Sequence, residues 1–350
     1  MSYSKSGVNE EAAAKWVEKI SGDYSKGSSP LKERLKSQLG DYAAVFELNS
    51  NNWVATACDG VGTKLLWTLA GLGKPEDLAQ DLLAMTANDI LCVGATPQLF
   101  LDYMAIGRSE LLKEDGILGD FISSLQQKCF ESGQLLVGGE TAQLPDLYQG
   151  DHFDLAGFGV GFLSPEDYFD INTAKEGDQL WGWTSSGPHS NGYSWLRRSF
   201  DSKADANLIS KNFMPATKLY VNEFSQLRQA LKSASEVNVI RTAYHITGTG
   251  YLNLLRKQPK GRKISYQLEL GSACSEAVWV KELMKRHPDT DAKEFYRTFN
   301  MGVGFCILFS REFVQDNRSL LEDHALIPLG EMRENQSLVV DSLVLDEPSK

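Results

Sequence analysis

The stretch WVATACDGVGTK, residues 53–64, is the clearest guide to the fold because it joins an apolar segment to a polar turn with two glycines. Residues 53–58 are predicted to form a strand. The run that follows supplies the Asp59 carboxylate, the Thr63 hydroxyl and the Lys64 ammonium group, and its glycines, Gly60 and Gly62, permit close approach to an anion. Taken alone, this run is as consistent with a plain glycine turn as with a ligand site.

The same order of strand, polar glycine run and helix recurs along the chain, which indicates a mixed α/β protein of the α+β type. Apolar residues at helical spacing, each segment closed by a glycine, predict helices over 77–93 and 116–130. A short helix over 10–20 is expected in an N-terminal arm of about 50 residues. Further strands are predicted at 98–106, 135–138, 153–163 and 179–184, further helices near 193–200 and 216–233, and later strands near Val239, Ile264, Phe305 and Val339.

A turn-rich stretch, residues 164–178, is the expected domain boundary. It divides the 350 residues into domains 1–168 and 169–350, in line with about 100–200 residues per domain. In the strand predicted before it, Gly157, Gly159 and Gly161 recur with a period of two, so one face of that strand is bare. This face and the strand at 99–106 are expected to need a close partner, which predicts a homodimer joined through the first domain.

The composition excludes several classes of protein. Lys and Arg number 35 against 46 Asp and Glu, and the net charge of −11 argues against a nucleic-acid binder but not against a small phosphorylated ligand. Five cysteines without a C-x-x-C pair argue against a disulfide framework or a zinc site and favour the cytoplasm. No apolar segment is long enough to span a bilayer, so no membrane partner is expected.

Three carboxylates beside glycine or asparagine point to a metal. Asp59 follows a strand, Asp89 lies after Asn88 inside an apolar helix, and Glu140 follows the pair Gly138-Gly139. Such hard oxygen ligands suit Mg²⁺ with bound phosphates. A buried salt bridge would explain the polar residues of the helix equally well. Asp102 is a fourth candidate carboxylate, although a single polar residue on a strand is more often structural.

The run SSGPHSNG, residues 185–192, crowds hydroxyls, an amide and an imidazole between a strand and a helix. His189 suits a general acid–base role by its type, and a helix start after the run could hold a phosphate. Because this loop opens the second domain whereas the carboxylates lie in the first, we expect it to bind a different ligand from the one held at the metal. Residues 245–250 and 297–304 repeat the same junction.

Six runs, taken in order, resemble the phosphoribosylformylglycinamidine cyclo-ligase family, the aminoimidazole ribonucleotide synthetases of purine biosynthesis. The runs are residues 59–64, 88–89, 100–103, 138–141, 186–193 and 296–300. The resemblance implies an ATP- and Mg²⁺-dependent ring closure of formylglycinamidine ribonucleotide. It also implies a homodimer in which the N-terminal domains form a β-barrel, each followed by a C-terminal α/β domain.

The motif positions supply the expected site residues. The Mg²⁺ ligands are expected to be Asp59, Asp89 and Glu140. The expected ATP-binding residues are Asp59, Gly60, Gly62, Thr63, Lys64, Asn88, Asp89, Gly139, Glu140 and Thr141. The expected substrate-binding residues are Ser186, His189, Ser190, Asn191, His245, Thr247 and Asn300, and the expected catalytic residues are His189, Lys64 and Asp102.

The chain departs from the family pattern at two places. The family has a glycine-rich loop where residues 40–45 read GDYAAV, and Thr249 stands where the family has a glycine. A non-catalytic, nucleotide-binding paralogue is therefore one alternative. Another is a different ATP-using enzyme of the superfamily, although a selenophosphate synthetase would need an earlier cysteine than Cys58, and thiamine-phosphate kinases lack the run at 186–192.

Overall fold

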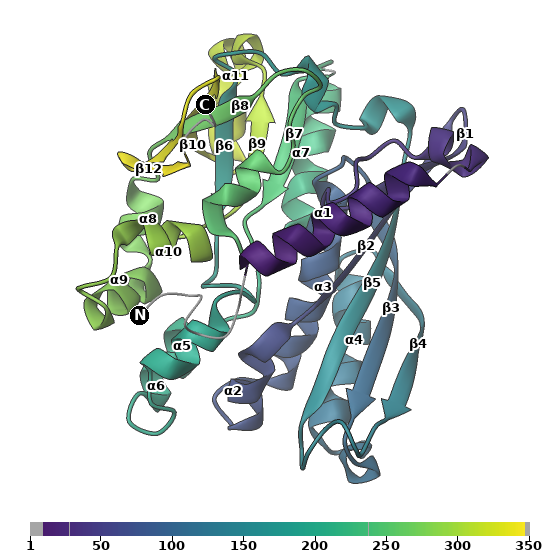
Figure 1. The fold of residues 1–350 in the computed structure, drawn as a ribbon, viewed down its shortest axis with the longest axis vertical. Helices are drawn as coiled ribbons and strands as arrows, with labels where there is room; N and C mark the ends of the chain where they lie inside the picture. The colour runs from purple at the N-terminus through teal and green to yellow at the C-terminus, as the bar shows by residue number, and fades with distance from the viewer. Residues whose placement is uncertain (1–9, 28, 237, 347–350) are drawn as a thin grey trace.

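The computed structural model describes residues 10–27, 29–236 and 238–346, which form two halves, each built around one β-sheet (Figure 1). The first sheet contains β1 (Ala44–Asn49), β2 (Asn52–Gly60), β3 (Thr96–Ile106), β4 (Leu135–Gln143) and β5 (Phe153–Leu163). Its order is β1-β2-β5-β3-β4, with β3 and β4 parallel and the other neighbours antiparallel. This sheet is open within one chain.

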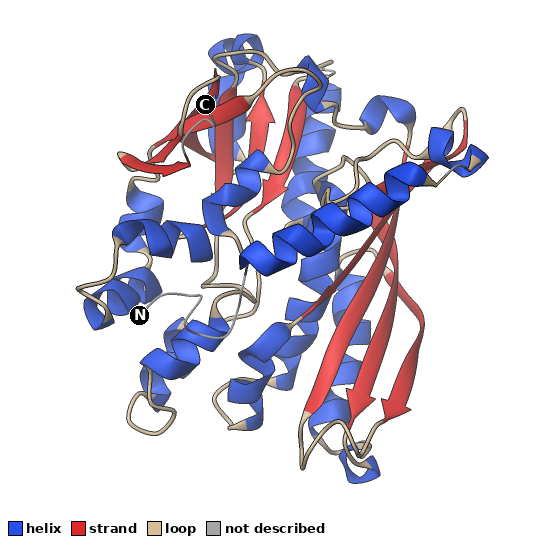
Figure 2. Ribbon diagram, in the orientation of Figure 1, coloured by secondary structure: helices blue, strands red, loops and turns tan. Residues whose placement is uncertain are grey.

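Helices α3 (Pro75–Leu91) and α4 (Ile117–Glu131) cover one face of the first sheet (Figure 2). Pro75 at the first helical turn, followed by Glu76 and Asp77, favours the start of α3 because these residues suit the free N–H groups and the dipole there. Helix α4 turns Phe121 and Leu125 into the core at helical spacing. The two helices pack side by side and are the scaffold on which half of the site is built.

The three glycines of β5 face α3 of the same chain. An added Cβ would lie 3.3 Å from Leu82 of α3 at Gly157, 2.8 Å from Ile90 at Gly159 and 2.5 Å from Ile90 at Gly161. The bare face therefore lets the helix approach the sheet closely. This corrects the expectation that the glycines need a partner subunit.

The opposite face of the first sheet carries exposed apolar side chains. Leu101 pairs with Phe158 across β3 and β5, and Leu135 and Val137 lie on the neighbouring strand β4. The exposed fractions are 36% for Leu101, 42% for Phe158, 50% for Leu135 and 52% for Val137. Such a continuous apolar surface is uncommon on a monomeric domain.

The second sheet has seven strands in the order β12-β11-β8-β10-β6-β9-β7. Their bounds are β6 (Gln179–Thr184), β7 (Ile240–His245), β8 (Ile264–Leu268), β9 (Val303–Phe309), β10 (Ile327–Glu334), β11 (Leu338–Val340) and β12 (Leu343–Asp346). Every residue of β9 is buried, so this strand lies at the centre of the largest hydrophobic core.

The remaining helices connect or cover these sheets. They are α1 (Glu10–Lys26), α2 (Leu65–Leu69), α5 (Tyr193–Ser199), α6 (Ala206–Asn212), α7 (Val221–Ser233), α8 (Ser272–Glu276), α9 (Val278–Arg286), α10 (Ala292–Thr298) and α11 (Arg311–Asp323). Over the described residues, none of the helices is both long and apolar enough to cross a membrane.

Most predicted elements are present, with two differences that matter for the site. Strand β4 continues to Gln143, so Gly139 and Glu140 lie within a strand and not in a turn after it. Strand β1 was not predicted, because its segment lies in the stretch read as an arm. β1 pairs with β2 in an antiparallel hairpin. Tyr42, which comes just before β1, is buried in the core.

Candidate active site

A cleft of about 540 Å³ opens between the two halves. From the first half it is lined by the end of β2, the start of β5 and Met85 of α3, and from the second half by two loops. The lining residues are Cys58, Asp59, Gly60, Gly62, Met85, Asp154, Leu155, Ala156, Ser190, Asn191, Thr247 and Gly248. Because residues from both halves meet here, the cleft can hold two ligands against each other.

Asp59 lines this cleft, and Asp89 lies near enough for its charge to act on Asp59. Asp59 lies near the end of β2, where its Oδ1 accepts a hydrogen bond of 2.7 Å from the Gly60 backbone N–H. Burial, followed by the nearby charge of Asp89, raises the pKa of Asp59 to about 6. Among the described residues, neither carboxylate forms an ion pair with a lysine or an arginine. The pair therefore leaves negative charge uncompensated, as a cation site requires.

Gly60 is needed for this geometry, since an added Cβ would lie 2.9 Å from the Leu155 carbonyl oxygen. Gly62 adopts a positive φ of 63°, which glycine reaches without strain. Thr63 faces the second half, with its hydroxyl 3.2 Å from that of Ser194. The chain therefore turns sharply at Gly60 and Gly62, between β2 and α2.

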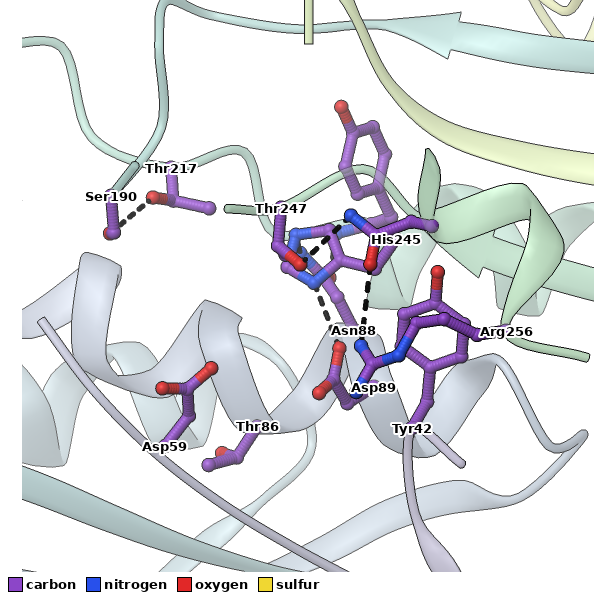
Figure 3. Close-up of polar contacts among 12 residues, drawn as sticks. Tyr42, Asp59, Thr86, Asn88, Asp89, Ser190, Thr217, His245, Thr247 and Arg256 are labelled. Atoms are coloured by element: carbon purple, nitrogen blue, oxygen red, sulfur yellow. Dashed lines mark hydrogen bonds and ion pairs between the residues drawn. The ribbon is translucent and has the colours of Figure 1, made fainter. Parts of the chain in front are cut away.

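His245 fixes the orientation of Asp89. The imidazole stands at the end of β7, and its Nδ1 lies 3.0 Å from Asp89 Oδ1, while its Nε2 lies 3.3 Å from the amide nitrogen of Asn88 (Figure 3). Asn88 accepts a backbone hydrogen bond from Tyr220 through its oxygen, so its nitrogen donates to His245. Nε2 therefore accepts this hydrogen bond, and Nδ1 carries a proton that it donates to Asp89.

Lys64 is held inside the protein and does not reach the cleft. Its Nζ donates to Asp81 Oδ1 at 2.9 Å and to the Pro215 carbonyl oxygen at 2.9 Å, and the side chain is buried. Asp81 also accepts hydrogen bonds from the backbone and hydroxyl of Thr217. The polar stripe on α3 therefore contains a buried salt bridge that joins the halves, which corrects the expectation that Lys64 contacts ATP or acts in catalysis.

The loop at residues 185–192 presents Ser190 and Asn191 to the cleft. The Ser190 hydroxyl lies 3.0 Å from that of Thr217, and the Asn191 amide nitrogen is buried without a hydrogen-bond partner among the described residues. Thr247, in the loop after β7, lines the same cleft. These three side chains are the polar groups that the second half offers to a ligand.

Two other residues of the predicted substrate set support the loop from behind. Asn300 accepts from the Ser185 hydroxyl at 3.0 Å and donates to the Gly187 carbonyl oxygen at 2.9 Å. Ser186 donates to the Ala216 carbonyl oxygen. Their polar atoms are engaged within the protein, so they shape the loop instead of facing the cleft.

His189 is turned away from the cleft, although the sequence favoured it as the acid–base group. Its side chain is fully buried against Gly304, both ring nitrogens lack hydrogen-bond partners among the described residues, and its backbone φ is 64°. Burial, followed by the charge of His245, lowers its pKa well below the usual value. The imidazole is therefore neutral and does not touch the cleft surface.

Asp102 and Glu140 lie in a second hollow, between β3, β4 and α4, together with Gly139 and Thr141. Burial raises the pKa of Asp102. Glu140 pairs with Tyr103 and is three strands from Gly60 in the register of the sheet, or about 14 Å at the usual strand spacing of ~4.8 Å. Within the part of the chain that is described, no group of three His, Cys, Asp or Glu side chains could hold a metal, which corrects the expectation that Asp59, Asp89 and Glu140 meet within one chain.

Sequence reasoning missed Met85 and Asp154, which line the cleft, and the pair Tyr42–Arg256, which lies beside Asp89. Asp154 could have been found, because a carboxylate at the start of a strand next to the glycine run of β5 is a visible signal. Tyr42 and Arg256 are 214 positions apart and belong to no common motif, so only the fold brings them together.

Comparison with known proteins supports one family across both halves. Residues 40–163 match the model described as AIR synthase related protein, N-terminal domain, and residues 175–341 match the corresponding C-terminal domain. The phosphoribosylformylglycinamidine cyclo-ligase of Thermoanaerobacter pseudethanolicus is 35% identical over 322 residues, covering 88% of this chain and 90% of the relative. That of Staphylococcus aureus (strain bovine RF122 / ET3-1) is 31% identical over 97% of this chain and 98% of its own.

Solved structures show the same fold at lower identity. A chain of a HypE–HypF complex aligns with a TM-score of 0.62 and 16% identity, covering 93% of this chain and 95% of its own. AaThiL complexed with AMPPCP and TMP aligns with a TM-score of 0.59 and 12% identity over 90% of this chain and 96% of its own. Both likenesses concern the fold alone.

Proposed function

Because the chain belongs to the AIR synthase related proteins and, among them, to the phosphoribosylformylglycinamidine cyclo-ligases, we propose that it closes the imidazole ring of formylglycinamidine ribonucleotide at the expense of ATP. The reaction belongs to purine biosynthesis and makes the enzyme an ATP-dependent ligase. Its products are aminoimidazole ribonucleotide, ADP and phosphate.

The observation that carries this function is the carboxylate pair in a cleft formed by both halves. Asp59 and Asp89 lie close enough for the charge of Asp89 to raise the pKa of Asp59, and His245 contacts Asp89 at 3.0 Å. Asp89 keeps its second oxygen available, because His245 engages only Oδ1. This donor set suits Mg²⁺, and the bound ion would neutralise charge that develops on the phosphates.

The ring closure consists of two transfers. The γ-phosphoryl group of ATP moves to the formyl amide oxygen, and the amidine nitrogen then attacks the activated carbon while the C–O bond breaks and phosphate leaves. The attacking nitrogen must lose one proton. Among the described residues that line the cleft, Asp59 and Asp154 are the acids able to accept it.

We assign ATP to the first half and the ribonucleotide to the second, with domains 1–168 and 169–350. The support is that the carboxylates belong to β2 and α3, whereas the uncharged donors Ser190, Asn191 and Thr247 belong to the loops of the second half. Replacing Ser190 by Ala is expected to raise KM for the ribonucleotide and leave KM for ATP unchanged. Ser186→Ala is the matched control, since that hydroxyl donates to the Ala216 carbonyl oxygen and does not line the cleft.

A homodimer through the first sheet completes the proposal, with the enzyme in the cytoplasm. The support is the exposed apolar face around Leu101, Leu135, Val137 and Phe158, which lies opposite α3 and α4. Two such open sheets packed face to face would form a barrel across the two subunits. We place the remaining predicted ATP contacts, Gly139, Glu140 and Thr141, in the hollow between β3, β4 and α4 that also holds Asp102.

One assay tests the function. Purified protein is given formylglycinamidine ribonucleotide, ATP and Mg²⁺, and both ADP and aminoimidazole ribonucleotide are measured. We expect equal amounts of the two products and no ADP when the ribonucleotide is omitted. ATP binding without turnover would identify a non-catalytic paralogue. ADP formation only with thiamine monophosphate or selenide in place of the ribonucleotide would identify a different enzyme of the superfamily.

A further inference from the structure

Arg256 and Tyr42 come from opposite halves of the chain and meet beside Asp89 (Figure 3). Arg256 follows the short helix η7 (Gly250–Leu255), and Tyr42 comes just before β1. The guanidinium carbon lies 5.0 Å from the centre of the Tyr42 ring, within the range of a cation–π contact (Figure 3). The tyrosine is 5% exposed and packs edge-on against Tyr244, so the platform under the guanidinium is rigid.

Apart from its contact with the Tyr42 ring, the guanidinium of Arg256 has few partners among the described residues. Its side chain is exposed, no carboxylate of a described residue forms an ion pair with it, and its one side-chain hydrogen bond runs 3.4 Å to Asn253 Oδ1. The neighbouring Lys257 is the opposite case, because it is buried and held by Asp41 and the Cys92 carbonyl oxygen. A guanidinium has five N–H donors, so Arg256 keeps most of them for a ligand.

Arg256 faces the carboxylates of the cleft. In Figure 3 its side chain extends toward Asp89 beside the Tyr42 ring. Its charge also acts on Asp59: burial and the charge of Asp89 raise the pKa of Asp59, and the charge of Arg256 opposes that rise. A guanidinium from the second half therefore lies beside Asp89 of the first, and its charge also acts on Asp59.

We propose that Arg256, oriented by the ring of Tyr42, binds a phosphate oxyanion beside Asp89. The inference rests on the proposed function, which places phosphates in this cleft. A planar guanidinium matches two phosphate oxygens at once, and a stacked guanidinium loses little freedom on binding. The phosphate belongs either to the polyphosphate of the nucleotide or to the ribose phosphate of the substrate. Arg256 is the binding residue and Tyr42 a positioning residue.

This assignment gives a role to the departure of the chain from its family pattern. The loop at 40–45 is poorer in glycine than in the family, yet Tyr42 and Ala43 are buried in the structure. The aromatic ring ties the loop to the second half through Arg256, Lys257 and Tyr244. The loop is thus held in place by packing, and it contributes a platform for a cation.

The test measures binding and turnover separately. Calorimetric titrations with ATP–Mg²⁺ and with formylglycinamidine ribonucleotide are compared for the unaltered chain, Arg256→Met and Arg256→Lys. We expect Arg256→Met to weaken one of the two ligands about ten- to a hundred-fold, with partial recovery in Arg256→Lys. The ligand that weakens identifies the source of the phosphate. KM for that ligand should rise in parallel, with a smaller change in kcat.

The control is Arg318→Met. Arg318 also stacks on an aromatic ring, 5.4 Å from Trp181, but on α11 of the second half, away from the cleft. Tyr42→Phe keeps the ring and is expected to bind like the unaltered chain, whereas Tyr42→Leu should weaken the same ligand as Arg256→Met. Changes below about two-fold for both ligands in Arg256→Met, or an equal effect of Arg318→Met, would overturn the proposal. Failure of the proposed function is recognised separately, because the unaltered chain would then show no turnover.

Discussion

Lys64 Nζ donates a 2.9 Å hydrogen bond to Asp81 Oδ1 in the interior of the protein, where both side chains are at most 1% exposed. Asp81 in turn accepts the backbone N–H of Thr217 at 2.7 Å, so one buried carboxylate ties α3 to the second half. Removing one partner of a buried ion pair leaves the other charge uncompensated, which is costly.

Lys64→Met is therefore expected to lower the free energy of unfolding by about 3–5 kcal/mol, measured by urea denaturation. Lys218→Met is the control, since Lys218 is 32% exposed and its distance to Glu223 is 3.5 Å. A Lys64→Met chain with unchanged stability and a large loss of kcat would instead support the direct catalytic role predicted from the sequence.

Asp89→Asn keeps the size of the side chain and the contact with His245 but removes the charge at the cleft. We expect kcat to fall by at least about 100-fold, with the circular dichroism spectrum unchanged. The matched control is Asp120→Asn, on the exposed surface of α4. Full activity of Asp89→Asn would show that this carboxylate takes no part in ring closure.

The buried, neutral His189 makes stability depend on pH. Burial lowers its pKa in the folded chain, with His245, Lys64 and Lys218 adding to the effect, so on acidification the unfolded chain takes up this proton first, near its value of 6.5. Above pH 6.5 the group contributes no pH dependence. Below it, stability falls by about 1.4 kcal/mol per pH unit until the folded pKa is reached.

This contribution is measured by comparing urea midpoints at pH 7.5 and 5.5 for the unaltered chain and His189→Asn, since Asn tolerates the positive φ of position 189. The variant should lose less stability on acidification. The exposed His152 provides the control variant, His152→Asn. Identical slopes in all three chains would contradict the burial of His189.

A charge on the open face of the first sheet should separate the proposed dimer. Phe158→Glu is expected to shift the sedimenting species from twice 38.8 kDa to 38.8 kDa at micromolar concentration. Leu147→Glu changes an even more exposed residue, at 75%, in the loop after β4 and should leave the dimer intact. A monomer in the unaltered chain would refute the dimer at once.

The sequence predicted those parts of the fold that depend on local pattern. The helix over 77–93 and the strands at 153–163 and 179–184 agree with α3, β5 and β6, because periodicity and terminal glycines define them. β1 was missed, since its short segment gains its stability from pairing with β2. The bare face of β5 was recognised, but its partner was not, because the pattern does not say whether a helix or another subunit covers it.

The sequence motifs indicated which segments form the candidate site, but they did not indicate which side chains of those segments face the cleft. Asp59, Ser190, Asn191 and Thr247 do line one cleft, as their strand-end positions suggested. Lys64 and His189 are of chemically suitable types, yet both point into the protein. The direction of a side chain depends on register and packing across the two halves, and a run of residues does not encode it alone.

The glycines of β5 have a consequence that reaches beyond packing. α3 rests directly on Gly157, Gly159 and Gly161, and the same helix carries Asp81, Asn88 and Asp89. The distance between α3 and the sheet therefore sets how far these polar groups lie from Asp59 on β2. A single methyl group added to the strand would lift the helix and with it one wall of the cleft. These glycines have no side chain, and by allowing close helix–sheet packing they determine the distance between the carboxylates of Asp59 and Asp89.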